Sequence, residues 1–340
     1  MNVCLLTKRF SFNGTGPSRV AFEILKGLEK RGYTIHKIEA KPNVTLYSYF
    51  IYTAIGIPLR LPRKGIDVYH ALVPLEGMWL PRNHSIVMIH DLFPTTNPDR
   101  VGAGMGRSKW KLAIGERYFS FGTKLASKCR FIVCNSDKTK QDVMEYLRVP
   151  EEKIRVIRLG ISSDLEPKPK KDRVFRIGTL SQLDKRKRID LLIKHFKGSK
   201  IDGELVIGGH GIDESILIHL ANGDSRIKFL GFVPDDKLAD FYNSLDVFVF
   251  PTGIEGYGLP MVEAMACKKP VVVLPDAIIP EEIKSRCIIT ENLGTLFSSH
   301  NYLENLCKST DHDGNYQFAK EHNWDECVEE HIELYQEVVG

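Results

Sequence analysis

The chain has 340 residues, of which 43% are hydrophobic and 26% are charged. This composition excludes a wholly disordered chain, and the length favours two domains over one hydrophobic core. The net charge of +4 hides an asymmetry, because residues 1–165 carry 26 Lys and Arg against 14 Asp and Glu, whereas residues 166–340 carry 21 against 29. The basic half favours an anionic membrane surface or a phosphate-bearing substrate, and no zinc-finger, homeodomain or RNP pattern indicates nucleic acid.

The seven cysteines are scattered and include no Cys-x-x-Cys pair, so neither a zinc site nor a disulfide framework is indicated. The opening stretch Met1–Leu6 lacks the long apolar core of a signal peptide, and no run of eighteen apolar residues occurs. We therefore expect a cytoplasmic protein that can also lie peripherally at the inner face of the membrane. The Asn-x-Ser/Thr matches are interpreted as chance.

Short apolar runs alternate with helical patterns along the first half of the chain. Between the first two runs, Ala21, Ile24, Leu25 and Leu28 recur at helical spacing, and Gly32 ends this helix. Strand–helix alternation of this kind predicts a parallel sheet with helices on both faces. The strands predicted here are 3–7, 35–38, 68–71, 86–89, 131–134 and 154–157.

The stretch Pro167–Lys171 breaks every periodic pattern, so we expect an interdomain linker there, between domains 1–165 and 166–322. Alternation then restarts, with predicted strands 175–180, 204–207, 227–230, 247–250, 271–274 and 287–289. The predicted fold class is α/β, with two doubly wound Rossmann-like domains in tandem. Parallel sheets bind ligands beyond the carboxyl ends of their strands, so two such domains facing a central cleft would suit an enzyme with a donor on one and an acceptor on the other.

A glycine-rich loop between a strand and a helix carries the first functional signal. The strand ends at Phe250, and Gly256 and Gly258 let backbone amides approach a ligand just ahead of a helix N-terminus, which favours an anion. Glu255 and Glu263 lie eight positions apart around this turn. One carboxylate can meet a transferred group while the other accepts hydrogen bonds from a diol. Two glutamates alone would more often be a solvated side chain and a helix cap.

A run of four basic residues, Lys185–Arg188, follows the first strand of the second domain and precedes a helix. Such a run is usually a solvated face. At the carboxyl end of a strand, however, it supplies cationic charge where the negative charge of a nucleotide diphosphate leaving group develops.

With these motifs, the chain resembles the retaining GT-B glycosyltransferases of glycosyltransferase family 4, the group 1 glycosyltransferases, along nearly its whole length. The segment Glu255–Glu263 is similar to the Glu-x7-Glu signature of the family, and Gly14–Val20 is similar to its opening loop. Gly231–Pro234 resembles the approach to the signature loop. In this fold the C-terminal helix, here within 323–340 and beginning near Trp324, crosses back to the first domain.

The resemblance implies a role for each matching residue. Glu255 would contact the donor sugar, Glu263 the ribose hydroxyls, and Arg186 and Lys187 the diphosphate, with Lys185 and Arg188 as chemically similar alternatives. The remaining donor-binding residues implied are Gly14, Gly16, Val233, Gly256, Tyr257, Gly258 and Leu259.

Two histidines end apolar strands of the first half. A lone histidine there is more often structural, but His90, in His90-Asp91, matches a residue that contacts the donor sugar in the family. Asp91 is expected to orient the loop or His90 itself. His70 is a weaker candidate for the acceptor side, as is Arg19.

Two further patterns are set aside. Gly14-x-Gly16 follows a strand and opens a helix, but Arg19 stands where a dinucleotide fingerprint has its third glycine, so a dehydrogenase is poorly supported. Asp311-His312-Asp313 has the form of a metal-binding Asp-x-Asp, yet no apolar strand precedes it, and we expect a surface loop. No metal and no cofactor is expected beyond a nucleotide-diphosphate sugar as co-substrate.

The predicted activity is retaining transfer of a hexose from a UDP- or GDP-sugar to a hydroxyl of a saccharide or lipid-linked acceptor, in glycan or glycolipid assembly. The diphosphate itself could take the acceptor proton, so no enzymic base is required. A nucleotide-sugar epimerase of similar architecture and a non-catalytic sugar-nucleotide-binding subunit remain alternatives.

Two aromatic stretches in the basic half, residues 44–62 and 105–121, are compatible with ordinary core and helix surface. Their other interpretation is a face that lies on an anionic membrane and reaches a lipid-linked acceptor.

Overall fold

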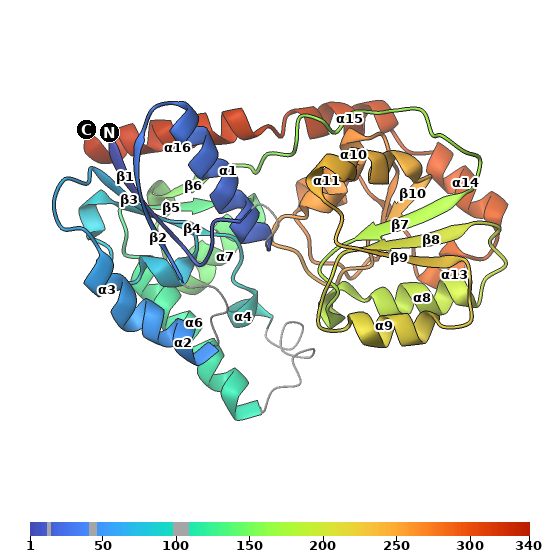
Figure 1. The fold of residues 1–340 in the computed structure, drawn as a ribbon, viewed down its shortest axis with the longest axis horizontal. Helices are drawn as coiled ribbons and strands as arrows, with labels where there is room; N and C mark the ends of the chain where they lie inside the picture. The colour runs from blue at the N-terminus through green and yellow to red at the C-terminus, as the bar shows by residue number, and fades with distance from the viewer. Residues whose placement is uncertain (12–14, 41–45, 98–108) are drawn as a thin grey trace. The chain divides into compact units, whose positions relative to one another are not determined.

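The structure, a computed structural model, describes residues 1–11, 15–40, 46–97 and 109–340. The described residues form two compact units (Figure 1), one comprising the chain up to Gly160 together with Trp324–Gly340 and the other comprising Ile161–Asn323. The chain thus divides a few residues before the boundary at 165/166 expected from the sequence.

The segment expected to be a linker packs against the second unit. The Glu166 carboxylate accepts a hydrogen bond of 2.6 Å from the Tyr316 hydroxyl and pairs with Lys320. Lys170 pairs with Asp246. The prolines break the periodic pattern here, but the flanking charges hold the segment in place.

The first unit contains a six-stranded parallel sheet, and all six predicted strands are confirmed. The strand order is β2-β1-β3-β4-β5-β6. The chain continues from β1 to β2 on one side of the sheet and from β3 to β4 on the other side. The strand order therefore reverses between β1 and β3. The bounds are β1 Asn2–Thr7, β2 Thr34–Glu39, β3 Val68–Ala71, β4 Ser85–Ile89, β5 Phe131–Cys134 and β6 Ile154–Val156.

Helices cover both faces of this sheet. One face packs in a core with Ile57, Ala126 and Val143 of α3, α6 and α7. On the other face lie α1 and α16 (Figure 1). The helices are α1 Gly16–Lys30, α2 Leu46–Ile51, α3 Ile57–Arg60, α4 Phe93–Thr96, α6 Lys109–Ala126, α7 Asp137–Leu147 and α16 Trp324–Val339, with a π-helical turn, Tyr52–Gly56, between α2 and α3.

The second unit contains another six-stranded parallel sheet, of order β12-β11-β10-β7-β8-β9, and its six predicted strands are also confirmed. Here the order reverses between β7 and β10, as in a Rossmann fold. The bounds are β7 Arg176–Leu180, β8 Glu204–Gly208, β9 Ile227–Gly231, β10 Val247–Val249, β11 Val271–Val273 and β12 Ile288–Ile289.

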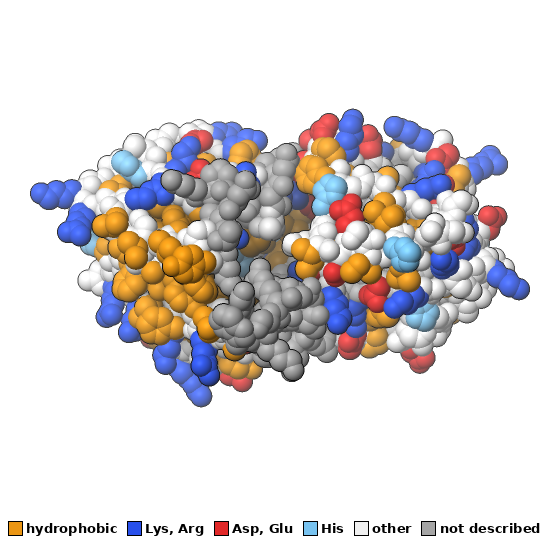
Figure 2. All heavy atoms as spheres, turned by 60° about the horizontal axis from the view of Figure 1, so that its bottom comes forward, with side chains coloured by type: hydrophobic (Ala, Val, Ile, Leu, Met, Phe, Trp, Pro, Cys, Tyr) orange, Lys and Arg blue, Asp and Glu red, His pale blue; other side chains and the backbone are white. Residues whose placement is uncertain are grey.

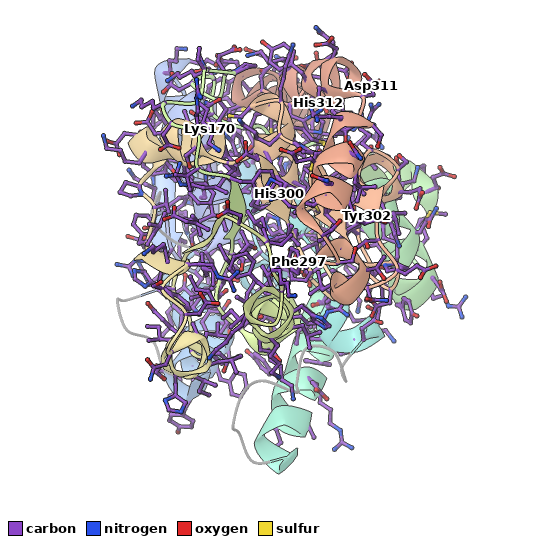
Figure 3. All side chains as sticks on the ribbon, turned by 90° about the vertical axis from the view of Figure 1, so that its right-hand side faces the viewer. Lys170, Phe297, His300, Tyr302, Asp311 and His312 are labelled. Carbon is purple, nitrogen blue, oxygen red and sulfur yellow. The ribbon has the colours of Figure 1, made fainter. Side chains whose placement is uncertain are left out.

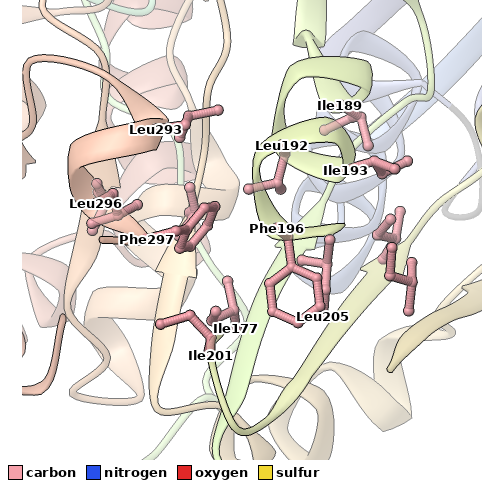
Figure 4. Close-up of a cluster of buried hydrophobic side chains, with 14 of the residues drawn as sticks. Ile177, Ile189, Leu192, Ile193, Phe196, Ile201, Leu205, Leu293, Leu296 and Phe297 are labelled. Carbon is pink, nitrogen blue, oxygen red and sulfur yellow. The ribbon is translucent and has the colours of Figure 1, made fainter. Parts of the chain in front are cut away.

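Helices again cover both faces of the sheet. Figure 4 shows Phe196 of α8 and Phe297, which follows α13, among the aliphatic side chains of one face. The two phenyl rings pack edge to face, with their centroids 6.0 Å apart. Figure 1 shows α10, α11 and α15 on the other face. The helices are α8 Ile189–Lys197, α9 Glu214–Ala221, α10 Asp235–Ser244, α11 Leu259–Ala266, α12 Glu281–Lys284, α13 Leu293–Leu296, α14 His300–Lys308 and α15 His312–Lys320.

The C-terminal helix α16 belongs to the first unit, as the fold class predicts. It packs on α1, where a Cβ atom at Gly27 would lie only 2.5 Å from a methyl group of Val328. At the edge of this contact, Arg31 donates to Glu329 at 2.6 Å and to Asp325 at 3.1 Å. The absence of a side chain at Gly27 therefore sets how closely the two helices approach.

We expect Gly27→Ala to lower the free energy of unfolding by about 1–3 kcal/mol, because the added methyl group overpacks the contact with the stiff, buried Val328. Helix propensity alone would predict a gain of about 1 kcal/mol from the same substitution. Denaturant unfolding monitored by circular dichroism measures the difference.

Gly115→Ala on α6 is the matched control, since a Cβ atom at Gly115 meets nothing within 4 Å. It should be neutral or stabilising. Equal effects of the two substitutions would contradict the close contact between α1 and α16.

Candidate functional site

The strongest concentration of predicted site residues lies at the carboxyl edge of the second sheet. The loop 181–188 follows β7 and the loop 250–258 follows β10, and these are the neighbouring strands between which the sheet order reverses. A doubly wound sheet binds ligands at this position, because the two loops diverge and leave a crevice. Backbone hydrogen bonding joins the loops directly, with the Gly253 amide donating to the Arg186 carbonyl at 2.9 Å.

Glu255 and Lys187 form a buried ion pair between these loops. The Lys187 ammonium donates to Glu255 Oε1 at 2.5 Å, and the Thr252 hydroxyl donates to the same oxygen at 2.6 Å. Lys187 also lies over the ring of Phe250, with its nitrogen 5.1 Å from the centroid. Only 6% of Lys187 and 9% of Glu255 are exposed, so each charge depends on the other for compensation.

The charges around Glu255 keep its carboxyl ionised. Burial alone raises its pKa, but the charges of Lys187 and Arg186 and the two hydrogen bonds outweigh burial, so the pKa lies below the usual value. Burial also lowers the pKa of Lys187, and the charge of Glu255 opposes that shift. Glu255 is therefore placed to accept hydrogen bonds and not to donate a proton.

The four side chains of the basic run Lys185–Arg188 have different partners. Arg186 donates to the Ile254 carbonyl at 3.0 Å, and its Nη1 lies 3.8 Å from Glu255 Oε2. Arg188 is held away by both oxygens of Asp276, at 3.0 and 2.9 Å, and by the Thr252 carbonyl. Lys185 is exposed. Of the four, Arg186 and Lys187 lie nearest the Glu255 carboxylate, which is the pair selected from the sequence.

The glycine-rich loop ends in the N-terminus of α11. Gly258 is the N-cap, and its φ of 103° is a backbone conformation that favours glycine over residues with a side chain. The helix begins at Leu259, directly after this glycine, and Pro260 lies in its first turn. The amides of Gly256, Tyr257, Gly258 and Leu259 thus lie at a helix N-terminus, where partial positive charge favours an anion.

Glu263 is buried on α11, with 2% of its surface exposed. Its Oε2 accepts a hydrogen bond of 2.8 Å from the Tyr242 hydroxyl on α10. The carboxylate is thereby oriented by a neighbouring helix, a contact that periodicity in the sequence could not reveal.

Val233 lies buried just after β9, beside a loop that the sequence analysis missed. In that loop Gly209 has φ at 112°, and a Cβ atom there would overlap the Ser181 carbonyl. Next to it, His210 Nε2 accepts from the Phe232 amide at 2.8 Å, and the two rings stack at 6.4 Å. The Gly208-Gly209-His210-Gly211 run was the available signal, because clustered glycines after a strand mark a close backbone approach.

His90 lies at the carboxyl edge of the first sheet, at the end of β4. Its Nε2 bonds with the Leu72 carbonyl at 3.0 Å, and because a carbonyl only accepts, Nε2 carries the proton. Burial lowers the pKa of His90 to about 4, despite this hydrogen bond, so the ring is neutral at pH 7. Asp91 accepts from the Phe93 amide at 3.3 Å and so orients the loop.

His70 has the surroundings of a structural residue. It is fully buried on β3, and its Nδ1 bonds with the Tyr335 hydroxyl of α16 at 2.8 Å. Its ring also lies 5.3 Å from that of His331. Alternation along β3 turns Tyr69 and Ala71 to one face and His70 to the face covered by α16.

The opening loop is only partly described. Gly14 lies outside the described residues. Gly16 is exposed at the first position of α1, and the Arg19 amide donates to the Thr15 carbonyl at 3.0 Å in the first turn.

The Asp311-His312-Asp313 segment is not a loop but the start of α15, with Asp311 as the N-cap accepting from the Gly314 amide at 2.9 Å. The His312 ring bonds with the carbonyls of Lys268 and Cys307, both at 3.1 Å. Figure 3 shows Asp311 and His312 beside each other at this helix end. Within the described ranges, no group of three or more His, Cys, Asp or Glu side chains could hold a metal ion.

We expect Lys187→Met and Glu255→Gln each to lower the free energy of unfolding by about 3–5 kcal/mol, because each leaves a buried partner uncompensated. The double variant should lose less than the sum of the two single variants. Denaturant unfolding of the four proteins in this double-mutant cycle measures the coupling.

Asp190→Asn is the control for that cycle. It breaks the exposed pair of Asp190 and Lys194 on α8, which is worth about 0.5 kcal/mol or less. If Lys187→Met and Glu255→Gln lower the free energy of unfolding by no more than Asp190→Asn does, the pair of Lys187 and Glu255 is solvated.

Two family models match consecutive parts of the chain. The model described as Glycosyltransferase Family 4 matches residues 14–165, and the model described as Glycosyl transferases group 1 matches residues 162–301. The second match includes the whole of the site at β7 and β10.

Curated relatives include two mannosyltransferases. The O-antigen chain mannosyltransferase B of Escherichia coli is 25% identical over 231 residues, which are 61% of this chain and 60% of the relative. The O-antigen chain mannosyltransferase RfbU of Salmonella typhimurium is 27% identical over 235 residues, which are 67% of this chain and 60% of the relative. The chain thus matches 60% of the length of either relative.

Solved structures with this fold include HepE of Anabaena in complex with UDP and glucose, with a TM-score of 0.71, 16% identity and coverage of 99% of this chain and 100% of that one. WaaG, a glycosyltransferase involved in lipopolysaccharide biosynthesis, gives a TM-score of 0.73 at 12% identity over 98% of this chain and 99% of that one. At such identities the likeness establishes the GT-B fold. The two family models, which together match residues 14–301, show that the chain belongs to the group 1 glycosyltransferases of glycosyltransferase family 4.

Proposed function

We propose that the protein is a retaining hexosyltransferase that takes its sugar from a nucleotide-diphosphate donor and transfers it to a hydroxyl of a glycan or lipid-linked acceptor. The observation that carries this proposal is the ionised Glu255 carboxylate, held by Lys187 and Thr252 beside Arg186 at the carboxyl edge of β7 and β10. A donor site at the carboxyl edge of β7 and β10 needs both a negatively charged and a positively charged side chain. The carboxylate serves the sugar hydroxyls, and the cations serve the diphosphate.

In this proposal the donor lies with its diphosphate at Arg186 and the N-terminus of α11. The guanidinium and the loop amides stabilise the negative charge that develops on the leaving diphosphate. Glu255 accepts hydrogen bonds from the sugar, Glu263 from the ribose, and backbone groups at Val233 lie by the base. Lys187 assists the diphosphate through its charge and holds Glu255 in place.

The chemical step proceeds through an oxocarbenium-like transition state, with the acceptor hydroxyl attacking from the face that the diphosphate leaves. The bond from the anomeric carbon to the diphosphate oxygen breaks, a bond to the acceptor oxygen forms, and the acceptor proton passes to the diphosphate. The Glu255 oxygen Oε1 is engaged by both Lys187 and Thr252, which lowers its nucleophilicity and suits electrostatic support better than nucleophilic attack. We also assign His90, as a neutral ring, to a hydroxyl of the donor sugar.

The relatives suggest which substrates to test first. Because two of the curated relatives are O-antigen chain mannosyltransferases, we propose mannose as the first candidate sugar and assembly of a surface polysaccharide as the setting. The structure of HepE holds UDP and glucose, so UDP-glucose is the second candidate donor.

The proposal is tested by thermal stabilisation with UDP, GDP and ADP, followed by turnover of GDP-mannose and UDP-glucose with crude lipid-linked acceptors. We expect one nucleotide to stabilise the protein, and the matching donor to give a product whose anomeric configuration, measured by NMR, is that of the donor. Glu255→Ala should lower kcat by about 10²-fold or more.

Glu304→Ala, on the exposed face of α14, is the matched control and should leave kcat unchanged. A donor product formed without acceptor would indicate an epimerase instead. Stabilisation by none of the three nucleotides, or full activity of Glu255→Ala, would contradict the proposal.

We further propose that the first unit lies on a membrane through an apolar stripe, which we define as Tyr47, Ile51, Ile55 and Leu59. These side chains recur every four residues along α2, the π-helical turn and α3, and are 75%, 45%, 56% and 81% exposed. Figure 2 shows hydrophobic side chains gathered on this face of the first unit, with Lys and Arg side chains near its border. An apolar stripe with a basic border suits an anionic lipid surface.

The lengths of the helices and the second aromatic stretch also bear on a membrane contact. No helix within the described ranges is long and apolar enough to cross a bilayer. Of the second aromatic stretch named from the sequence, residues 105–108 lie outside the described residues, while Phe121 is 58% exposed on α6.

We expect Ile55→Ser/Leu59→Ser to weaken binding to vesicles of phosphatidylglycerol and phosphatidylcholine by about tenfold or more, because each lost side chain forfeits on the order of 1 kcal/mol or more of burial. Ile212→Ser/Ile216→Ser removes two equally exposed apolar side chains from the second unit and should have no effect. Vesicle flotation measures both, and equal losses would contradict docking through the stripe.

A further inference from the structure

We infer that the first unit carries a second anion site, separate from the donor site and specific for closely spaced phosphate groups. It is a surface pocket of about 750 Å³, here named the basic pocket, with six cationic side chains in its lining. They are Arg82, Lys124, Lys128, Arg130, Arg148 and Lys153.

The basic pocket lies at the amino-terminal edge of the first sheet. Arg82 shortly precedes β4, Arg130 immediately precedes β5 and Lys153 immediately precedes β6. Lys124 and Arg148 lie at the C-terminal ends of α6 and α7. Nucleotide-type ligands of parallel sheets bind at the opposite, carboxyl edge, so this pocket needs a different occupant.

Within the described part of the chain, no carboxylate is paired with the lysines and arginines gathered in the basic pocket. No Asp or Glu is among its lining residues. Among the residues that the structure describes, no ion pair is found for Arg82, Lys124, Lys128, Arg148 or Lys153. Elsewhere in the unit, cations such as Arg31, Lys140 and Arg155 pair with carboxylates. Like charges gathered without a counterion repel each other, and a bound anion would relieve that repulsion.

Helix ends explain only part of the cluster. A cation in the last turn of a helix is favourable by itself, which accounts for Lys124 and for Arg148 just beyond α7. It does not account for Arg82 and Lys153, which lie ahead of strands, nor for their convergence on one pocket. Arg130 is anchored instead, donating to the carbonyls of Val338 and Glu337 of α16 at 3.1 and 2.8 Å.

The chemistry of the lining selects phosphate over a sugar or a base. It contains no aromatic side chain on which a base or sugar could stack and no carboxylate to accept sugar hydroxyls. It does contain guanidinium groups, which bind phosphate with two parallel hydrogen bonds, together with the side chains of Asn83 and Ser127. The volume is sufficient for more than one phosphate group.

Two sources could supply such a ligand, an anionic phospholipid headgroup or a soluble polyphosphate. The lipid source is compatible with the apolar stripe, because α6, which carries Lys124 in its last turn, packs on α2 through Tyr118 and Phe50, whose ring centroids lie 4.3 Å apart. The inference itself does not depend on glycosyl transfer or on the stripe, since it rests on the uncompensated charge of the pocket.

The test uses the full chain, tripolyphosphate as the soluble probe and vesicles of 30% phosphatidylglycerol in phosphatidylcholine as the lipid probe. Lys128→Glu/Lys153→Glu should weaken binding of the recognised probe by about tenfold or more, because each cation near an anionic surface contributes substantially. Lys26→Glu/Lys200→Glu, at exposed positions elsewhere, makes the same change in net charge and should alter binding by less than about twofold. Lys124→Gln/Lys153→Gln, which introduces no carboxylate, should show a smaller loss in the same direction.

Every outcome of this test either supports or contradicts the second anion site. Binding of tripolyphosphate that competes with vesicles identifies the phosphate groups themselves as the ligand, whereas vesicle binding alone identifies the headgroup surface. Equal losses in the pocket variant and the charge-matched control, or no binding of either probe by the wild type, overturn the inference. Stabilisation by UDP or GDP should be unchanged in all three variants, so failure here is distinct from failure of the proposed donor site.

Discussion

The buried pair of Lys187 and Glu255 is the contact on which the candidate site depends. It joins the loops that follow β7 and β10, the two strands between which the second sheet changes direction. Neither charge could stay buried alone, so the pair fixes both loops at once and keeps the carboxylate ionised. Arg186 and the N-terminus of α11 then lie beside a carboxylate whose position and charge are set.

The scaffold explains why these residues meet. In both units a parallel sheet buries its strands between helices and leaves its carboxyl edge to loops, and His90 and Glu255 each follow a strand at such an edge. The basic pocket lies instead at the amino-terminal edge of the first sheet. The returning helix α16 completes the first unit, and its close approach depends on Gly27.

Much of this architecture could be predicted from the sequence, because buried parallel strands are continuous apolar runs, and all twelve predicted strands are present. Glu255 and Glu263 were site candidates because of their spacing around a glycine turn and their similarity to the family signature, and Arg186 because of the basic run after β7 and the same resemblance. Spacing could not reveal that Lys187 is buried against Glu255, or that Thr252 and Tyr242 orient the two carboxylates, since these contacts join residues distant in sequence or depend on the fold of the loop. The prediction of a surface loop at Asp311–Asp313 was wrong for a related reason, because a helix cap orders a segment that looks irregular in the sequence.

A crystal structure of the protein with the nucleoside diphosphate that stabilises it would test the central claim most directly. We expect diphosphate oxygens within hydrogen-bonding distance of the Arg186 guanidinium and the amides at the start of α11, with the Lys187–Glu255 contact retained or shared with the diphosphate. A nucleotide bound elsewhere, with Glu255 turned into solvent and Lys187 unpaired, would contradict the claim that this buried pair builds the donor site.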